Sequence, residues 1–276
     1  MEIIDGKALA KKNEEYLSNL IENKNVHPKL VIISCDPDNA SWVYMRNKTK
    51  AAKRIGIECE IIKFEPSSNT EKMIEEIYKL NEDDKVSGII VQLPLPKHFD
   101  IVKIQKAISP RKDVDGFHPN SLFTSCTPLA CMRMLREYNL NVDGKHCIVI
   151  GRSEIVGKPL AKLLLNANAT VTQCHSHTSP EMLKNLCKQA DFIFAAAGKI
   201  NLIQSDYLKD GVVLIDISIN RDENGNLCGD AAKECAEKCS YISPVPGGVG
   251  PMTVNTLMWN TVSACISQEN FSLDSF

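Results

Sequence analysis

The sequence lacks the features of a membrane, secreted or nucleic-acid-binding protein. No apolar run approaches the roughly 20 residues that a helix needs to span a bilayer. The first residues, MEIIDGKALAKKNEEYL, have no charged-then-apolar signal pattern. Basic residues form no block, and 32 Lys and Arg stand against 34 Asp and Glu, for a net charge of −2. We therefore expect neither a membrane nor a nucleic acid among the partners.

The sequence also lacks a metal-binding pattern. Its eleven cysteines are an odd number, they are scattered, and most lie in apolar runs, as Cys147 and Cys174 do. Cys235 and Cys239 are four residues apart, with no second pair and no matching histidine, so no zinc site is expected. We expect buried free thiols, no metal, and a reducing compartment, the cytoplasm.

Strand and helix signals alternate along the chain, and there is no low-complexity tract or short repeat. Strands are predicted at 29–34, 57–64, 87–93, 145–151, 170–174, 191–198 and 212–219. Helices are predicted at 39–56, 69–81, 157–168, 180–189 and about 252–267. This order favours parallel strands with right-handed crossovers. Asn224-Gly225 predicts a hairpin with a two-residue turn, both residues at positive φ.

Turn residues between about 118 and 127 separate two α/β halves. The fold class is therefore α/β: two α/β domains, the second a Rossmann-like dinucleotide-binding domain, with a cleft between them. The stretch SPVPGGVGPMTV (243–254) carries no charge and combines three prolines with three glycines. We interpret it as a rigid return of the chain, after which the last helix packs on the first domain.

The segment GRSEIVGKP (151–159) lies between a predicted strand and a predicted helix, where a dinucleotide phosphate would meet free helix N–H groups. Its G-x-S-x-x-x-G spacing differs from G-x-G-x-x-G, so an ordinary βα turn is an almost equal alternative. The next strand ends in CHSHT (174–178), without the acid that an NAD site usually places there. Arg152, His175 and Ser176 could instead receive a 2′-phosphate, which favours NADP over NAD.

Three further segments carry candidate site residues. Tyr44 and Lys48 share one helix face. Taken alone, this pattern favours a solvated lysine on an amphipathic surface, and the alternative is an aromatic platform beside a proton-transferring amine. Gln92 leaves the carboxyl end of a strand, where open α/β sheets bind ligands. In KDVDGFHP (112–119) two acids lie two residues apart. An Asx-turn explains either acid, while one carboxylate could accept both N–H groups of a ring such as a 2-aminopyrimidinone.

The chain resembles one family, the bifunctional methylenetetrahydrofolate dehydrogenase/methenyltetrahydrofolate cyclohydrolases, in six segments spread over nearly its whole length. They are IIDGKALA (3–10), SWVYMRNKTKAAKRIGI (41–57), GIIVQLPLP (88–96), KDVDGFHP (112–119), GRSEIVGKP (151–159) and PVPGGVGPMTV (244–254). The resemblance implies an oxidoreductase and hydrolase of one-carbon metabolism. It would oxidise 5,10-methylenetetrahydrofolate with NADP and hydrolyse the methenyl product to 10-formyltetrahydrofolate. It also implies a homodimer that pairs through the nucleotide domains.

The resemblance carries roles to individual residues. Lys48 is the central catalytic residue with Gln92 hydrogen-bonded to it, Tyr44 stacks on the folate, and Asp115 holds the pterin edge. Further substrate contacts are expected at Leu93, Pro246, Gly247 and Gly248. Cofactor contacts are expected at Gly151, Arg152, Ser153, Ile155, Val156, Gly157, His175, Ser176, Gly198 and Ile217. Residues 1–120 with 252–276 would form the folate-binding catalytic domain, and 121–251 the NADP-binding domain.

The chain departs from the family pattern at several points. Only NSLFTS separates Pro119 from Cys126, about ten residues fewer than usual, and Ala130 and Ser218 stand where the family tends to have glycine. The stretch AAAGKINLI (195–203) lacks the usual Pro-Gly. Two alternatives therefore stay open: a cyclohydrolase with weak or lost dehydrogenase activity, and a non-catalytic folate- or nucleotide-binding protein.

Overall fold

The computed structural model describes residues 1–35 and 39–268, and in it the chain forms two compact units. Met1–Lys11 and Thr127–Thr253 form one, called here the six-stranded unit; Lys12–Cys126 and Val254–Phe276 form the other, the three-stranded unit. The boundaries fall inside three helices, α1 (Gly6–Lys24), α5 (Cys126–Glu137) and α8 (Val249–Gln268). The sequence predicts residues 1–11 in the first domain, but the six-stranded unit holds them because β1 (Glu2–Ile3) pairs with β11 (Cys239–Ile242).

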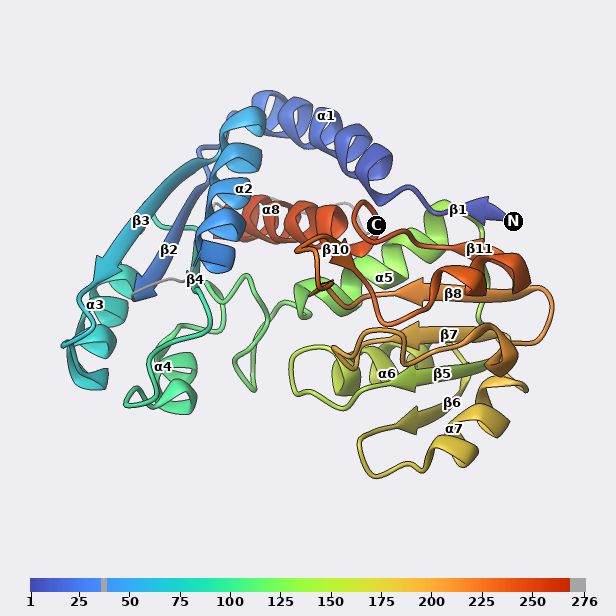
Figure 1. Cartoon of the computed structure of the whole chain (residues 1–276). Coiled ribbons are helices and arrows are strands. Elements are labelled where there is room, and N and C mark those ends of the chain that lie inside the picture. The colour runs from blue at the N-terminus through green and yellow to red at the C-terminus, as the bar shows by residue number, and fades with distance from the viewer. Residues whose placement is uncertain (36–38, 269–276) are drawn as a thin grey trace. The chain divides into compact units, whose positions relative to one another are not determined.

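A parallel sheet of three strands forms the centre of the three-stranded unit (Figure 1). Its order is β3 (Glu58–Phe64), β2 (Lys29–Cys35) and β4 (Gly88–Val91). The middle strand, KLVIISC, is buried from its second residue to its last, as expected for a parallel strand covered on both faces. The helices of this unit include α2 (Asn39–Ile55), α3 (Thr70–Glu82) and α4 (Ile101–Ala107). Met73 and Ile77 of α3 pack with Val31 and Ile33 of β2 in one core cluster.

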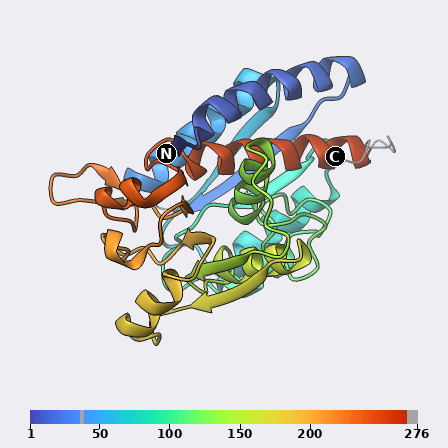
Figure 2. The ribbon, with the colours of Figure 1, turned by 90° about the vertical axis from the view of Figure 1, so that its right-hand side faces the viewer.

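Helices α1 and α8 run side by side in this unit (Figure 2). The rings of Tyr16 and Trp259 stack with centroids 5.5 Å apart, and Leu17 packs in one core cluster with Leu257 and Met258. Helix α8 carries no charged residue and is largely buried, as a helix that is apolar on most faces must be. It begins at Val249, three residues earlier than predicted, so Pro251 lies in its first turn.

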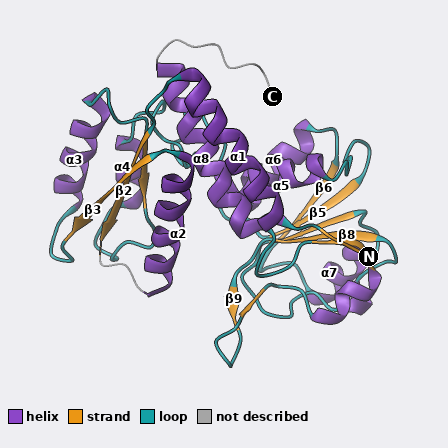
Figure 3. Cartoon of the chain, turned by 90° about the horizontal axis from the view of Figure 1, so that it is seen from above, coloured by secondary structure: helices purple, strands orange, loops and turns teal. Residues whose placement is uncertain are grey.

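The six-stranded unit is a parallel sheet with helices packed on it (Figure 3). Its order is β1-β11-β8-β7-β5-β6, with β5 (His146–Ile150), β6 (Thr170–Cys174), β7 (Phe192–Ala195) and β8 (Val212–Asp216). Helices α6 (Gly157–Asn166) and α7 (Pro180–Cys187) follow β5 and β6, and 3-10 turns lie at Ser205–Tyr207 and Lys233–Lys238. Two core clusters form around this sheet, one with Val149 and Phe194, the other with Ile148 and Ile193. Because side chains alternate along a strand, these clusters lie on opposite faces.

The predicted hairpin at 220–230 is present, but its turn differs from the prediction. Strands β9 (Asn220–Arg221) and β10 (Leu227–Cys228) pair antiparallel with Arg221 opposite Leu227, which leaves five residues in the loop. Only Gly225 of the Asn-Gly pair has positive φ, at 80°. The carboxylate of Asp222 accepts the N–H groups of Asn224 (2.9 Å) and Asn226 (2.8 Å), and this capping favours the wider loop over a two-residue turn.

The predicted strands and helices are present, with ends that differ by a few residues. The strands predicted to end at 198 and 219 end at Ala195 and Asp216, because the chain turns outward there into loops. The sequence patterns missed β1, α1, α4, α5 and β11. Both β1 and β11 pair with strands distant in the sequence, and β1 has only two residues, so local periodicity says little about them.

All eleven cysteines are free, and nine of them are buried, as predicted. Burial raises the pKa of several thiols, including Cys187 and Cys239, each to about 12. Among the described residues, no group of three or more His, Cys, Asp or Glu is placed to hold a metal ion. Nor does any helix between residues 1 and 268, the segment 36–38 aside, have the length and apolar character required to cross a membrane.

The proline–glycine stretch forms a tight connection within the six-stranded unit. Gly247 has φ +109°, a conformation that favours glycine, and the N–H of Gly248 donates to the carbonyl of Pro244 at 2.8 Å. Gly6, at the start of α1, lies so close that a Cβ there would be 1.9 Å from the carbonyl oxygen of Gly248. The segment is therefore rigid and closely packed, as its composition indicated.

Candidate functional site

Lys48 and Gln92 form a hydrogen-bonded pair in the three-stranded unit. The ammonium Nζ of Lys48 donates to Oε1 of Gln92 at 3.1 Å, and the amide Nε2 of Gln92 donates to the carbonyl of Leu93 at 2.8 Å. This second bond fixes which end of the amide faces the lysine. Lys48 is only 8% exposed, which excludes the solvated surface lysine that its sequence pattern alone favoured. A lysine so enclosed is uncommon and suggests a function.

Tyr44 lies one helical turn before Lys48 on α2, hence on the same face. Its side chain is half-buried, and burial raises the pKa of its phenol, which stays protonated at neutral pH. Gln92 directly follows β4, and its backbone N–H donates to the carbonyl of Ile33 in β2 at 2.8 Å. The pair thus sits at the carboxyl edge of the parallel sheet, the edge at which such sheets bind ligands.

The two acids of KDVDG have different surroundings. Asp113 is 1% exposed, and its Oδ2 accepts the N–H of His118 at 2.7 Å. Its backbone carbonyl accepts the hydroxyl of Ser121 at 3.1 Å and the N–H of Gly116 at 3.1 Å. The carboxylate of Asp113 therefore closes its own loop, through the N–H five residues on and not two residues on as in an Asx-turn. That leaves Asp115 as the acid available to a ligand.

Asp115 lies in the electrostatic neighbourhood of Lys48. Loss of water around its half-buried carboxyl raises its pKa, while the charge of Lys48 and a hydrogen bond from the thiol of Cys126 lower it. The same burial, together with the negative charge of Asp115, raises the pKa of the Cys126 thiol well above its usual range. The Cys126 thiol, which donates to the carbonyl of Val114 at 3.4 Å, thus stays protonated and is not a nucleophile. An amine, an amide and a carboxyl group are brought together here.

The short segment after Pro119 packs directly on this loop. The hydroxyl of Ser125 donates to the carbonyl of Gly116 at 2.9 Å, and the N–H of Leu122 donates to Pro110 at 3.1 Å. Asn260 of α8, 3% exposed, donates its amide to the carbonyl of Val114 at 2.9 Å. The loop that presents Asp115 is therefore held by the last helix as well as by its own turn.

The GRSEIVGKP segment forms a tight strand-to-helix turn in the six-stranded unit. A Cβ on Gly151, whose φ is +131°, would lie 2.2 Å from the carbonyl oxygen of Ala196. A Cβ on Gly157 would lie 2.3 Å from the carbonyl oxygen of Gly151. The hydroxyl of Ser153 accepts the N–H groups of Val156 (3.2 Å) and Gly157 (3.3 Å). Both glycines thus permit the backbone approaches on which a dinucleotide turn depends.

The residues assigned to a 2′-phosphate lie beside this turn. Arg152 is exposed and its side chain has no hydrogen-bond or ion-pair partner among the described residues, while Ser176 is exposed at the end of β6. The backbone N–H of His175 donates to the hydroxyl of Thr178 at 3.0 Å, and the rings of His175 and His177 meet edge to face. Strand β6 pairs with β5, so its carboxyl end lies next to Gly151. The guanidinium of Arg152 and the hydroxyl of Ser176 are available to an anion here, while Nδ1 of His175 accepts the N–H of His177 at 3.2 Å.

The remaining cofactor candidates differ in accessibility. Ile155 is 37% exposed, Val156 is half-buried, and Gly198 has φ +68° with open space around it. Ile217 is only 8% exposed and packs in a core cluster, and its contact with the cofactor stays a prediction. Ile219, two residues further, is 44% exposed. It lies beyond the end of β8 at Asp216, a boundary that the apolar run 212–219 does not mark.

The strand order indicates where a ligand would bind in this unit. From β5 the chain passes outward to β6 and then returns across β5 to β7, so the connections diverge between β5 and β7. At such a switch point the loops leave in opposite directions and open a crevice outside the carboxyl ends of the strands. Gly151 follows β5 at this point, and Ala196 follows β7.

Pro246, Gly247 and Gly248, predicted to contact substrate, belong to the six-stranded unit. Pro246 is exposed, whereas Gly248 is buried against Gly6. Their contact with a substrate stays a prediction.

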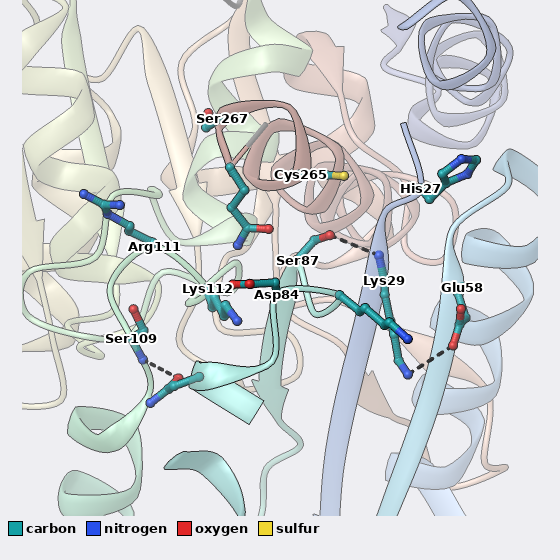
Figure 4. Close-up of a pocket in the computed structure, with 13 residues that line it drawn as sticks. His27, Lys29, Glu58, Asp84, Ser87, Ser109, Arg111, Lys112, Cys265 and Ser267 are labelled. Carbon is teal, nitrogen blue, oxygen red and sulfur yellow. Dashed lines mark hydrogen bonds and ion pairs between the residues drawn. The ribbon is translucent and has the colours of Figure 1, made fainter. Parts of the chain in front are cut away.

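A cavity of about 1000 Å³ lies at the opposite edge of the three-stranded sheet (Figure 4). It is lined by residues at the amino ends of the strands, among them Lys29, Glu58 and Ser87. Lys29 pairs with Glu58 at 3.1 Å and with Glu60 at 2.8 Å. Because Lys48 and Gln92 lie at the carboxyl edge, this cavity is separate from the candidate site.

Comparison with known families matches both halves of the chain. Residues 4–115 match the tetrahydrofolate dehydrogenase/cyclohydrolase catalytic domain, and residues 125–269 match the tetrahydrofolate dehydrogenase/cyclohydrolase NAD(P)-binding domain. The bifunctional protein FolD of Streptococcus pyogenes is 46% identical over 279 residues, which cover 96% of this chain and 98% of that protein.

Solved structures agree with this match. The bifunctional enzyme FolD, methylenetetrahydrofolate dehydrogenase/cyclohydrolase, from Campylobacter jejuni has a TM-score of 0.93 and 41% identity, over 97% of this chain and 99% of that chain. The Trypanosoma brucei methylenetetrahydrofolate dehydrogenase-cyclohydrolase, solved with NADP cofactor and an inhibitor, has a TM-score of 0.91 and 34% identity. That match covers 96% of this chain and 97% of that one.

Proposed function

The chain belongs to the tetrahydrofolate dehydrogenase/cyclohydrolase family, and on that premise we propose that it is a bifunctional enzyme of one-carbon metabolism. It oxidises 5,10-methylenetetrahydrofolate to 5,10-methenyltetrahydrofolate with NADP and hydrolyses the product to 10-formyltetrahydrofolate. The observation that carries the proposal is the enclosed Lys48, hydrogen-bonded to Gln92 and electrostatically coupled to Asp115 at the carboxyl edge of a parallel sheet.

The six-stranded unit has the features that NADP requires. Its glycine turn would allow a pyrophosphate to approach the backbone at the amino end of α6, where the helix dipole favours an anion. Arg152, His175 and Ser176 would hold the 2′-phosphate, and the exposed Ile155 and Ile219 would contact apolar parts of the cofactor. When bound, NADP supplies the acceptor for the hydride that leaves the methylene bridge.

The oxidation step needs positioning more than acid–base chemistry, because hydride transfers directly from the methylene carbon. Tyr44, a protonated phenol with an aromatic face, would stack on the folate. The carboxyl group of Asp115 would accept N–H groups from the pterin edge, which Asp113 cannot do because its own loop occupies it. These contacts would hold the reacting carbon in place.

The hydrolysis step requires proton transfer. Water attacks the methenyl carbon, and Lys48 in its amine form accepts a proton from that water as the C–O bond forms. The resulting ammonium group can return the proton to N5 as the C–N5 bond breaks, while the hydroxyl proton of the tetrahedral adduct leaves to solvent. The sum is one methenyl cation and one water giving one 10-formyl product and one proton. Gln92 would keep Lys48 oriented throughout.

The direct test follows NADP reduction with methylenetetrahydrofolate and, separately, loss of the methenyl absorbance. Both activities are expected. Hydrolysis without NADP reduction would identify a cyclohydrolase that has lost the oxidation step, and the absence of both activities with folate binding retained would identify a binding protein. Running NAD in parallel with NADP measures the cofactor preference.

Replacing Lys48→Met removes the amine while keeping a side chain of similar length. Cyclohydrolase turnover should fall by roughly 10² to 10⁴-fold, the range that a general acid–base contributes. NADP reduction should fall much less. Lys50→Met, an exposed lysine on the same helix, is the matched control and should leave both rates near wild type. Unchanged hydrolysis in Lys48→Met would exclude the assigned role.

Replacing Asp115→Ala leaves pterin N–H groups without an acceptor. Folate affinity, measured by titration, should weaken by roughly 1–3 kcal/mol, the cost of stranding buried donors. Asp84→Ala, an exposed acid of the same unit, should bind as wild type does. Equal affinities in wild type and Asp115→Ala would show that another group holds the pterin.

Replacing Arg152→Ala tests how the 2′-phosphate is recognised. The Michaelis constant for NADP should rise roughly 10- to 100-fold, as expected for loss of a charge-assisted hydrogen bond, while that for NAD changes little. The comparison variant is Lys158→Ala, since Lys158 pairs with Glu154 in the same segment. If Arg152→Ala affects NADP and NAD equally, Arg152 does not recognise the 2′-phosphate.

We also propose that the chain acts as a homodimer through the six-stranded unit, in keeping with the family resemblance. Sedimentation should then give twice the chain mass of 30.6 kDa, and a single-chain mass would contradict it. The free thiols fit a reducing compartment such as the cytoplasm, and the balanced charge favours small-molecule partners over nucleic acid or membrane.

A further inference from the structure

Asp230 is a fully buried acid in the six-stranded unit that none of the assigned roles uses. It is 0% exposed, and three consecutive backbone N–H groups of the loop after β7 donate to it. Ala197 (2.7 Å) and Gly198 (3.1 Å) donate to Oδ2, and Lys199 (2.7 Å) donates to Oδ1. Successive N–H groups of this kind form a concave anion site, and here the protein's own carboxylate fills it.

The loop after β8 contributes two more donors to the same carboxylate. The hydroxyl of Ser218 donates to Oδ2 at 2.7 Å, and the amide of Asn220 donates to Oδ1 at 3.0 Å. The Ser218 oxygen also accepts the N–H of Gly198 at 3.1 Å. Asp230 thus joins two neighbouring loops, each at the carboxyl end of a strand. Five hydrogen bonds compensate the cost of burying this charge.

Asp230 reaches this position because a second buried acid holds its backbone. The N–H groups of Asp230 (3.1 Å) and Ala231 (2.9 Å) donate to the two oxygens of Asp216, the last residue of β8. Burial, with a contribution from the charge of Asp230, raises the pKa of Asp216 to about 6. A Cβ on Gly229 would lie 2.0 Å from Oδ2 of Asp216, so only glycine fits there. The chain returning from the β9–β10 hairpin, which Figure 3 shows projecting at β9, is thereby anchored at the sheet edge.

The loop that Asp230 holds lies at the switch point. Ala196 opens this loop, its N–H donates to the carbonyl of Ile150 at 2.8 Å, and its carbonyl packs against Gly151. His175 and Ser176 lie on the β6 side of Gly151, where the 2′-phosphate half of the cofactor would bind. The loops after β7 and β8 lie on the other side of Gly151. A dinucleotide that crosses the crevice would place its nicotinamide half there.

We propose that Asp230 is a positioning residue for the hydride-transfer step. It sets the backbone of residues 197–199 and the Ser218 hydroxyl, and through them the wall against which the nicotinamide half of NADP rests. The N–H groups of this loop are committed to Asp230 and do not serve as donors to the cofactor. The proposal rests on the proposed function. It predicts that disturbing Asp230 affects oxidation and leaves hydrolysis, which depends on Lys48 in the other unit, largely unchanged.

The test is Asp230→Asn in the full-length chain. In this variant an NH₂ group replaces one carboxylate oxygen of Asp230. It then faces N–H donors that had an acceptor at that position, so the loop must shift. We expect kcat for NADP reduction to fall at least tenfold and the dissociation constant for NADPH, measured by fluorescence, to rise, with methenyl hydrolysis within twofold of wild type. Equal loss of both activities, or no loss of either, would overturn the proposal.

Two further variants keep the test decisive. If Asp230→Asn fails to fold, Ser218→Ala removes one donor to the carboxylate and should lower kcat for NADP reduction severalfold without affecting hydrolysis; unchanged oxidation would count against the proposal. Asp222→Asn, an acid at the tip of the same hairpin that caps only its own turn, is the control and should match wild type in both assays.

The two proposals fail in different ways. A wild-type chain that hydrolyses methenyltetrahydrofolate but does not reduce NADP contradicts the bifunctional assignment. NADPH binding then still decides the role of Asp230, because a dissociation constant unchanged by Asp230→Asn would exclude it.

Discussion

The hydrogen bond from Lys48 to Gln92 is the contact on which the chemistry of the three-stranded unit depends. A lysine that is 8% exposed has lost most of its water, and among the described residues Gln92 is its one hydrogen-bond partner. The amide is itself held by the carbonyl of Leu93. Lys48 therefore cannot swing into solvent as a surface lysine does. The parallel sheet supports this arrangement, since Gln92 continues β4 and its backbone bonds to Ile33 of the buried middle strand.

Close backbone approach has the corresponding role in the six-stranded unit. Gly151 packs on the carbonyl of Ala196, and Gly157 packs on the carbonyl of Gly151. These contacts leave no room for a side chain, so the loop after β5, the start of α6 and the loop after β7 form one rigid edge. Asp230 and Asp216 extend this edge to β8 through hydrogen bonds to backbone N–H groups. Hydrogen bonds to these two carboxylates thus fix the loop after β8, which the close contacts of the glycines do not reach.

Local sequence patterns predicted the strands and helices that carry the site because each is marked at its own position. Lys48 lies in the helix predicted at 39–56, and Gln92 lies at the carboxyl end of the strand predicted at 87–93. The patterns could not predict Asp230, whose partners lie 10 to 33 residues away in sequence and are mostly backbone groups. The end of β8 could not be predicted for a related reason: the uninterrupted apolar run 212–219 does not show that the strand ends at Asp216.

The hairpin illustrates competition between two local signals. Asn224-Gly225 is a strong indication of a hairpin, and a hairpin is present. The side chain of Asp222 nevertheless favours the five-residue loop. Its carboxylate accepts the N–H groups of Asn224 and Asn226, which a two-residue turn would not bring to it. The Asn-Gly pair therefore predicts that a hairpin forms, whereas the geometry of its turn depends on the hydrogen bonds that the Asp222 side chain accepts.

Ser218, which departs from the family pattern, takes part in these contacts. The family resemblance suggests glycine at this position, yet the serine hydroxyl both donates to Asp230 and accepts from Gly198. A glycine would remove both of these hydrogen bonds between the loops after β7 and β8 and Asp230. Serine at this position therefore adds hydrogen bonds to the loops proposed to contact the nicotinamide. It does not contact Lys48, Gln92 or Asp115, which belong to the other unit. Because each set of polar contacts is contained within one unit, oxidation and hydrolysis can be altered separately by substitutions in this chain.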